Sequence, residues 1–301
     1  MANAAIVTLA NASWIAQAKQ LFSSVYWNAG WQGDYVLLTD YSCTPAELSW
    51  FTDRGIIVKQ TDQLQNESVG SLQRPPFLLN KLYIFTPYFK RWEKIIYLDA
   101  DVVVLGSLDV LLNVMGFGAV RRANFFLDEA ATLRSQFRPK VNVNKLSSIT
   151  GIRYDFSSPS FNSGVLVFAT SLIDETLFAR LLSFFEKSKS FYRMVDQPLL
   201  NLFFYGRWQA LPTAYNVLVR NYVHSGFLTK LRNPFLCYAR VLHFNGLKKP
   251  WQNSHSVYHG LWKKNFDQAE FMMVGRAVPM RPNKYAMRKI YYFFCSLIKK
   301  Y

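Results

Sequence analysis

The sequence predicts an α/β fold built on one mainly parallel sheet. In the N-terminal part, short apolar runs at 4–9, 34–39 and 55–59 alternate with helical patterns at 14–25 and 45–52. Such alternation is typical of strand-helix-strand units, whose crossover helices make the sheet parallel. Half of the 301 residues are hydrophobic and 18% are charged, so the chain can bury a sizeable core.

Local signals justify the first elements. Asn11 and Ser13 are suited to cap the first helix, and Pro45 is suited to open the second. The polar stretch 60–76 predicts a loop. The apolar patterns that follow predict helices at 77–85 and 171–187 and strands at 94–98 and 161–168.

One stretch in the middle of the chain departs from this regularity. Residues 125–160 are more polar and less periodic, which predicts a lid or an acceptor loop. Asp174 and Glu175 are expected in the first turn of the 171–187 helix, where they would complement its dipole.

Charge points to an anionic partner. The net charge is +16, and residues 197–266 contain nine Lys or Arg, all four His and no Asp or Glu. Nucleic acid, an acidic membrane and phosphorylated small molecules all suit this balance, and a solvated basic face is the plainer alternative.

The cysteines and the N-terminus favour a cytoplasmic protein. Cys43, Cys237 and Cys295 are far apart and fit neither a zinc site nor a disulfide framework, so we expect three reduced thiols. Residues 1–10 do not form a signal peptide, and the chain has no run of 18 apolar residues.

Two aspartates, Asp99 and Asp101, directly follow the apolar run 94–98 and precede another one. On an extended chain they would point the same way, and burying two like charges is costly without a partner. A divalent cation such as Mg²⁺ or Mn²⁺ would satisfy both, at a strand end where ligands collect. A turn with two capping aspartates is the alternative.

Three further segments carry polar groups in apolar surroundings. In the segment 243–251, His243 can supply a third metal ligand and Lys249 can meet phosphate oxygens, although a core histidine before a surface turn explains it better when taken alone. Asp196-Gln197 opens an apolar helix, which a simple N-cap also explains. Asn162-Ser163-Gly164 interrupts a strand, and its glycine indicates close approach of a ligand or another backbone.

Together these motifs resemble glycosyltransferase family 8, the family of glycogenin, galactinol synthases and bacterial lipopolysaccharide galactosyl- and glucosyltransferases. The resemblance extends over residues 4–251. It implies a GT-A fold, which is a Rossmann-like, mainly parallel central sheet flanked by helices. The matching residues are Val7-Thr8-Leu9, Lys81, Leu98-Asp99-Ala100-Asp101, Phe161-Asn162-Ser163-Gly164, Asp196-Gln197, Leu211–Asn216 and His243–Trp251.

The resemblance also implies a donor site for a UDP-sugar. Asp99, Asp101 and His243 would bind Mn²⁺, or else Mg²⁺, against the diphosphate. Gly246 and Lys249 would contact that diphosphate. The remaining implied contacts are the ribose with the backbone of Ala100, the uridine with Leu9, Asn11 and Trp14, the donor sugar or phosphate with Lys81, and the sugar hydroxyls with Asn162, Ser163, Asp196 and Gln197.

Two positions depart from what is usual in the family. The run 10–14 is one residue shorter than the family's usual sequence, which puts its base contacts in doubt. Family members retain the anomeric configuration, and a carboxylate nucleophile would allow double displacement. Because Gln197 is an amide, we expect a front-face reaction instead, in which its carbonyl stabilises the cationic sugar.

The expected activity is Mn²⁺-dependent transfer of a hexose, glucose or galactose, to a glycan, lipid-linked or small hydroxyl acceptor. We expect a catalytic domain at 1–265 and a basic tail at 266–301. Residues 281–301 contain six Lys or Arg and no acid, and one helical face would carry Met287, Ile290, Phe294 and Leu297. This pattern predicts a helix at an anionic inner membrane face, with docking on the core as the alternative.

Other functions explain less of the sequence. A nucleic-acid-binding module would suit the charge but leaves the aspartates and the His243 segment unexplained, so no nucleic acid is expected as a partner. A self-glucosylating, glycogenin-like primer needs an acceptor tyrosine, and the sequence has 17 tyrosines. A nucleotide-sugar pyrophosphorylase would need a glycine-rich loop after Leu9, which the sequence lacks.

Overall fold

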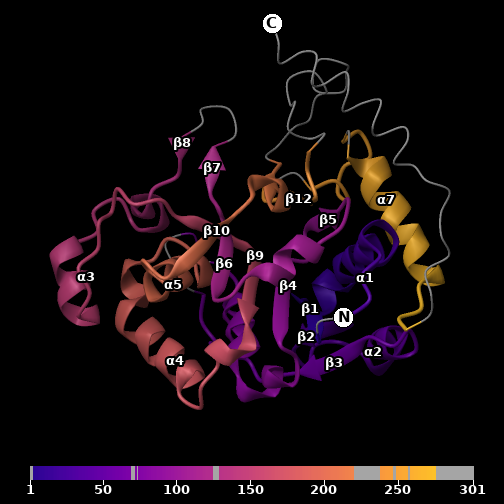
Figure 1. Ribbon diagram of the computed structural model, residues 1–301, viewed down its shortest axis with the longest axis horizontal. Helices are drawn as coiled ribbons and strands as arrows, with labels where there is room; N and C mark the ends of the chain where they lie inside the picture. The colour runs from indigo at the N-terminus through magenta and orange to yellow at the C-terminus, as the bar shows by residue number, and fades with distance from the viewer. Residues whose placement is uncertain are drawn as a thin grey trace, which may run out of the picture.

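The computed structural model describes residues 3–68, 72, 74–124, 129–219, 238–246, 249–256 and 258–275. A seven-stranded sheet forms its centre, with helices on both faces (Figure 1). The strand order is β10-β6-β9-β4-β1-β2-β3. In that order the strands are Trp208–Leu211, Phe117–Arg121, Phe161–Ala169, Lys94–Leu98, Ala4–Leu9, Asp34–Thr39 and Ile57–Gln60.

The sheet is mainly parallel, as predicted. Strands β4, β1, β2 and β3 pair in parallel, and β10 pairs in parallel with β6. Strand β9 runs antiparallel to both of its neighbours, β4 and β6. A small sheet of β11 (Val217–Leu218), β12 (Val241–His243) and β5 (Val102–Val104) adjoins it, and β7 (Ala123–Asn124) pairs with β8 (Glu129–Ala130).

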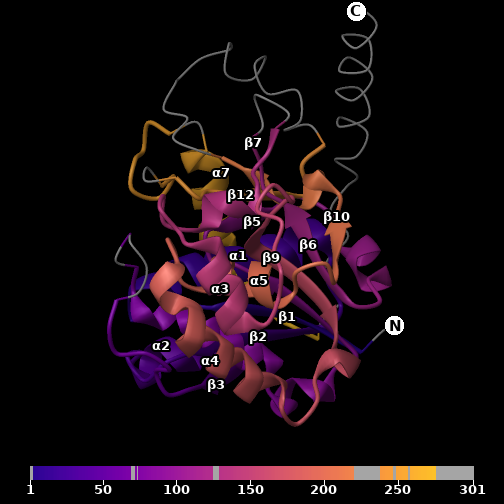
Figure 2. The ribbon, with the colours of Figure 1, turned by 90° about the vertical axis from the view of Figure 1, so that its left-hand side faces the viewer.

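Helices cover the two faces of the sheet. The first face carries α1 (Ile15–Ser24), α2 (Pro45–Thr52) and α7 (His259–Gln268). The other face carries α4 (Leu177–Ser188), α5 (Asp196–Phe203) and the 3₁₀ helix Pro76–Phe85. Helices α3 (Val143–Thr150) and α4 face the viewer in Figure 2.

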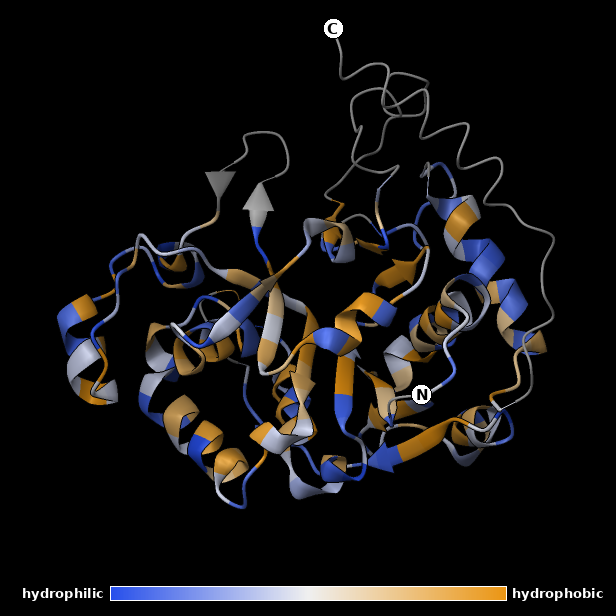
Figure 3. Ribbon diagram, viewed as in Figure 1, coloured by the Kyte–Doolittle hydropathy of each residue, from blue (hydrophilic) through white to orange (hydrophobic). Residues whose placement is uncertain are grey.

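The alternation of side chains along β1 builds a core on each face. Ala5 and Val7 join the core on the α4–α5 side, while Ala4 and Ile6 join the core on the α1 side. The central strands are correspondingly coloured as hydrophobic in Figure 3, whereas the outer helices alternate between hydrophobic and hydrophilic residues. The polar side chains of the site therefore lie at the ends of strands whose middles are apolar.

Three helix predictions need correction. The pattern at 14–25 forms α1 from Ile15, but neither predicted cap acts as one, because the Ser13 hydroxyl donates to Asn11 Oδ1 at 2.8 Å instead. The helix predicted at 171–187 begins only at Leu177, because Asp174 accepts hydrogen bonds from the backbone and hydroxyl of Thr176 ahead of it. The helix predicted at 77–85 is a 3₁₀ helix.

The polar stretch 125–160 is more ordered than predicted. It contains α3, whose first turn is capped by Asn142 accepting from the Lys145 backbone at 2.9 Å. Gly151 ends the helix in the left-handed region, with φ at 70°. Residues 125–128 lie outside the described residues.

The predicted division after residue 265 falls within α7. Described residues beyond it contact the domain: Trp27 Nε1 donates to Gln268 O at 3.1 Å, and Trp50 Nε1 donates to Glu270 Oε1 at 2.9 Å. The predicted amphipathic segment 281–301 lies outside the described residues, as do Cys237 and Cys295, whereas Cys43 is a free, buried thiol. Among the described residues, no helix has the length and apolarity needed to cross a membrane.

Candidate active site

The two predicted metal-binding aspartates lie in a tight turn between β4 and β5. Asp99 N–H donates to Gly164 O at 2.9 Å on the neighbouring strand β9, and Val102 N–H closes the turn on Asp99 O. Phe244 N–H donates to Asp101 O at 3.0 Å, which ties the turn to the end of β12. The backbone therefore forms the turn that was the alternative prediction. The two carboxylates nevertheless converge on one position.

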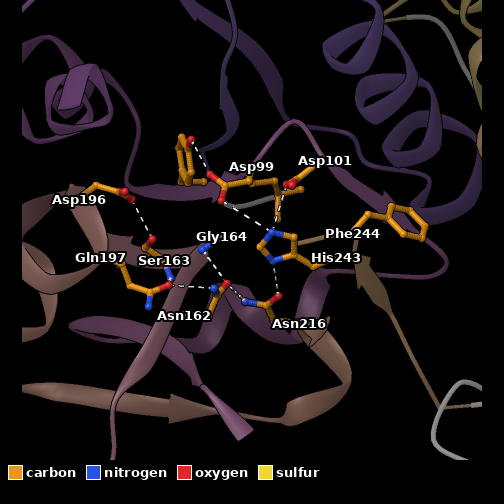
Figure 4. A network of polar contacts seen from close by, with 12 residues as sticks. Asp99, Asp101, Asn162, Ser163, Gly164, Asp196, Gln197, Asn216, His243 and Phe244 are labelled. Carbon is orange, nitrogen blue, oxygen red and sulfur yellow. Dashed lines mark hydrogen bonds and ion pairs between the residues drawn. The ribbon is translucent and has the colours of Figure 1, made fainter. Parts of the chain in front are cut away.

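That point is a cluster of three metal-ligand atoms. Oxygen or nitrogen atoms of Asp99, Asp101 and His243 all lie within 4.8 Å of one another. His243 Nε2 is 3.1 Å from Asp101 Oδ1 and 3.9 Å from Asp99 Oδ2 (Figure 4). The side chain of His243 is only 3% exposed, whereas that of Asp99 is 28% exposed. The cluster is therefore buried at His243 and accessible to solvent at Asp99.

Each aspartate uses its other oxygen to bind a lysine. Lys81 Nζ lies 3.0 Å from Asp99 Oδ1, which also accepts from the Tyr97 hydroxyl at 2.9 Å. Lys249 Nζ donates to Asp101 Oδ2 at 2.7 Å and to the carbonyl of Phe244. The oxygens directed at His243 are therefore Asp99 Oδ2 and Asp101 Oδ1, which lie close enough to bind one cation together.

Burial and charge shift the two carboxyl groups in opposite directions. Burial raises the pKa of Asp99, and the nearby Lys81 ammonium offsets only part of that effect. Burial opposes ionisation of Asp101 too, but His243 and Lys249 outweigh it and hold the pKa of Asp101 below its usual range. Asp101 therefore stays ionised at neutral pH.

Lys81 extends the cluster toward β9 and α5. Its Nζ lies 2.5 Å from Asp196 Oδ2 and donates to Ser163 O at 3.2 Å. Burial alone would lower the pKa of Lys81, but the carboxylates of Asp196 and Asp99 raise it above its ordinary value. One buried ammonium group thus connects the predicted metal ligands with the residues predicted to bind the sugar.

The residues predicted to bind the sugar form one hydrogen-bonded group. Ser163 Oγ donates to Asp196 Oδ2 at 2.8 Å, and Asn162 Nδ2 donates to Gln197 Oε1 at 2.9 Å. Asp196 and Gln197 lie in the first turn of α5 without capping it by a side chain. The structure therefore brings these four side chains to the same end of the sheet as Asp99.

The glycine that follows them leaves room for the histidine ring. A Cβ atom on Gly164 would lie 2.3 Å from Cε1 and 2.6 Å from Nδ1 of His243. Close approach at this glycine was predicted, and the group that approaches is the side chain of His243.

Of the nucleotide-binding residues predicted near the N-terminus, Trp14 lies beside Lys249. The rings of Trp14 and Trp251 pack edge to face with centroids 5.6 Å apart, and Lys249 Nζ is 5.9 Å from the centroid of Trp14. Leu9 is buried at the end of β1, and Asn11 is half-buried just before the 3₁₀ turn that contains Trp14. Ala100 is buried between the two aspartates, and Gly246 is half-buried in the segment that leads to Lys249.

Three residues of the cluster were not predicted as site residues. Tyr97 donates to Asp99, Asn216 contacts His243, and Gln136 accepts from Gln197 Nε2 at 2.6 Å. Asn216 ends a motif that matched the family, and Tyr97 lies on the strand before the aspartates, so both had a sequence signal. Gln136 lies in the weakly periodic stretch 125–160 and had none.

Comparison with known proteins fits this arrangement. The chain belongs to glycosyl transferase family 8, whose family model matches residues 54–255. The predicted family is thereby confirmed.

The curated relatives are longer than this chain. Glycosyltransferase GlyB of Streptococcus pneumoniae serotype 4 is 27% identical over 190 residues, covering 59% of this chain and 39% of GlyB. A lipopolysaccharide 1,2-glucosyltransferase of Escherichia coli is 28% identical over 200 residues, covering 60% of this chain and 50% of that enzyme. The chain thus spans half or less of the length of these two relatives.

Solved glycosyltransferases share the fold. The galactosyltransferase LgtC, solved with donor and acceptor sugar analogues, matches with a TM-score of 0.62 at 16% identity, over 94% of this chain and 99% of LgtC. The bifunctional glycosyltransferase WbbM matches with a TM-score of 0.63 at 19% identity, over 88% of this chain and 50% of WbbM. The predicted GT-A type fold is therefore confirmed.

The contact between Gly164 and His243 is testable by adding one methyl group. Gly164→Ala is expected to lower the free energy of unfolding by roughly 1–3 kcal/mol, because the new Cβ overlaps a buried ring in a tightly packed strand. Urea denaturation measures the difference. Gly116→Ala is the matched control, because a Cβ there meets no atom within 4 Å. Equal stability of the two variants would contradict the packing described.

Proposed function

We propose that this chain is a retaining hexosyltransferase that uses a UDP-sugar and a divalent metal ion, Mn²⁺ or Mg²⁺. The observation that carries the proposal is that the groups a UDP-sugar would need lie together. One end of the sheet holds the three possible metal ligands, the two lysines and the hydrogen-bonded polar side chains proposed to bind the sugar. Membership of glycosyl transferase family 8 supports the reaction class.

The ligand set fits a divalent cation. Asp99 and Asp101 supply hard oxygen atoms and His243 supplies one imidazole nitrogen, all converging from partly or fully buried positions. His243 Nε2 lies 3.1 Å from Asp101 Oδ1 and 3.9 Å from Asp99 Oδ2, so the three atoms are close enough to share one cation. When bound, the metal ion would act as a Lewis acid that stabilises the departing diphosphate.

Lys249 is suited to bind the donor's diphosphate. It lies at the edge of the cluster with its side chain 16% exposed, next to the rings of Trp14 and Trp251. An ammonium group there would meet phosphate oxygens, and the indole of Trp14 would stack on the base. Leu9, Asn11, Ala100 and Gly246 complete the proposed nucleotide contacts.

Gln197 is the proposed stabiliser of the cationic sugar. Its carbonyl oxygen is fixed by two donors, Asn162 Nδ2 at 2.9 Å and Ser163 N–H at 3.3 Å. The neighbouring carboxylate, Asp196, is engaged by both Lys81 and Ser163, which makes it a poor nucleophile. This supports a front-face reaction, in which the leaving diphosphate accepts the proton of the attacking hydroxyl.

The acceptor is proposed to be a glycan, a lipid-linked sugar or a small hydroxyl compound. LgtC, which shares the fold, has been solved with an acceptor sugar analogue, and an Escherichia coli relative is a lipopolysaccharide glucosyltransferase. These likenesses support a hydroxyl acceptor of the carbohydrate class, with glucose or galactose as the transferred hexose.

A panel of UDP-sugars tests the activity. We expect UDP release in the presence of Mn²⁺ and its loss on addition of a chelator. Asp101→Ala should abolish this release, because it removes both a ligand oxygen and the partner of Lys249. Asp267→Ala, which removes an exposed aspartate that pairs with Lys263 on α7, is the control. Metal-dependent turnover that survives in Asp101→Ala would refute the proposed site.

The front-face role of Gln197 makes a separate prediction. Gln197→Ala should lower kcat on the order of 100-fold, which is the usual effect of losing one group that stabilises transition-state charge. Steady-state kinetics with the preferred UDP-sugar would measure it, with circular dichroism to confirm folding. A variant that is folded and nearly as active as the wild type would exclude this role.

The basic segment 281–301 is proposed to hold the protein at an anionic membrane face. Its six Lys or Arg without an acid would attract acidic lipids. Flotation of the full chain with vesicles rich in phosphatidylglycerol should therefore exceed flotation with neutral vesicles. The same chain shortened by residues 281–301 should lose this difference, and equal flotation of the two forms would contradict the proposal.

A further inference from the structure

Side-chain amides form a continuous chain from the metal-ligand cluster to Gln197 (Figure 4). His243 Nδ1 lies 2.9 Å from Asn216 Oδ1, and Asn216 Nδ2 donates to Asn162 Oδ1 at 2.8 Å. Asn162 Nδ2 donates to Gln197 Oε1 at 2.9 Å, and Gln197 Nε2 donates to Gln136 Oε1 at 2.6 Å. All five side chains are buried, so water does not compete strongly for these bonds.

Two backbone groups fix the direction of this chain. Gly164 N–H donates to Asn162 Oδ1 at 3.0 Å, and Ser163 N–H donates to Gln197 Oε1 at 3.3 Å. A backbone N–H can only donate, so both acceptor atoms must be amide oxygens and not amide nitrogens. The atom of Asn216 that faces Asn162 Oδ1 must then be its NH₂ group.

The orientation of Asn216 decides which ring nitrogen of His243 carries a proton. With its NH₂ directed at Asn162, Asn216 presents its oxygen to His243 Nδ1, which must therefore be a donor. The other ring nitrogen, Nε2, faces Asp101 Oδ1 at 3.1 Å. Nδ1 is thus engaged within the protein, and Nε2 is the ring nitrogen that faces the aspartates of the proposed metal site.

Asn216 is held firmly enough to have this effect. It directly precedes β11, which pairs in parallel with β12, the strand that ends at His243. Val219 N–H donates to His243 O at 2.7 Å on the same ladder. Asn216 therefore lies at the start of the strand that pairs with β12, and its buried side chain meets that of His243.

We propose that Asn216 is a positioning residue that keeps the Nδ1 proton on His243 and aims Nε2 at the metal site, and that it orients Gln197 through Asn162. One directional chain of amides would then set both the nitrogen ligand and the carbonyl that faces the sugar. The proposal rests on the proposed function for the identity of the metal and the sugar, but the protonation of His243 Nδ1 does not depend on either.

Nitrogen NMR on the metal-free, full-length protein labelled with ¹⁵N-histidine tests the first step. The chain has four histidines, and His243→Gln identifies the signal of His243. The wild type should show a proton on Nδ1, which Asn216 Oδ1 accepts, and this buried proton should exchange slowly with water. In Asn216→Ala, which removes that acceptor, the Nδ1 proton should exchange many-fold faster.

Metal binding tests the consequence. Asn216→Ala should weaken Mn²⁺ binding, followed by electron paramagnetic resonance, by about 10–100-fold, which is the usual loss for a residue that orients a metal-bound histidine. Asn216→Asp should keep the Nδ1 proton, because a carboxylate also accepts from it, but should lower kcat by placing an acceptor against Asn162 Oδ1. Asn265→Ala, which removes a buried asparagine of α7 that accepts from Asn28, should change none of these quantities.

Two results would overturn the proposal. One is a wild-type His243 without a proton on Nδ1, which needs no variant to observe. The other is an Asn216→Ala protein with wild-type exchange of the Nδ1 proton and wild-type Mn²⁺ affinity. A wild type that binds no Mn²⁺ and releases no UDP would instead refute the proposed function, while the NMR result would still decide the role of Asn216.

Discussion

Compensation of buried negative charge is the constraint on which the site depends. The site contains three carboxylates, those of Asp99, Asp101 and Asp196. They form ion pairs with two ammonium groups, those of Lys81 and Lys249. Removing one partner from such a cluster leaves an unpaired buried charge, which typically costs several kcal/mol. Lys81 is central because it touches carboxylates from two distant parts of the chain, the β4–β5 turn and the start of α5.

The reversed direction of β9 makes that contact possible. In a parallel sheet the beginnings of strands lie far from the ends of their neighbours. Because β9 is antiparallel to β4, its first residues lie beside the last residues of β4, with Leu98 opposite Val165. Asn162 and Ser163 therefore lie at the same end of the sheet as Asp99. Gly164, which has no side chain, leaves room for the His243 ring to pack against the strand there.

The charged residues of this cluster could be selected from the sequence more directly than the neutral ones. Asp99, Asp101, His243, Lys81 and Lys249 could be found because charged groups in apolar surroundings need partners, and the family resemblance placed them in one order. The amides Asn162 and Gln197 were assigned roles through the family resemblance alone. Asn216 lay in a matching motif but received no role, and Gln136 had no sequence signal, because nothing in the sequence shows which groups the fold brings next to a neutral amide. The fold class and most strands followed from periodicity. Helix starts were less predictable, since Ser13 and Asp174 bonded to neighbouring side chains or turns instead of capping.

The neutral part also explains why an amide suits position 197. Gln197 accepts through Oε1 from Asn162 and Ser163 and donates through Nε2 to Gln136 Oε1. A carboxylate would keep the two acceptor contacts but would set a second acceptor against Gln136 Oε1. Relief would require Gln136 to turn its amide, which would cost the hydrogen bond from its Nε2 to Ser160 Oγ. Lys81 already pairs with Asp99 and Asp196, so among the described residues it could not also neutralise a carboxylate at position 197 without giving up part of those contacts. The amide hydrogen bonds and the charge balance therefore both favour glutamine at this position.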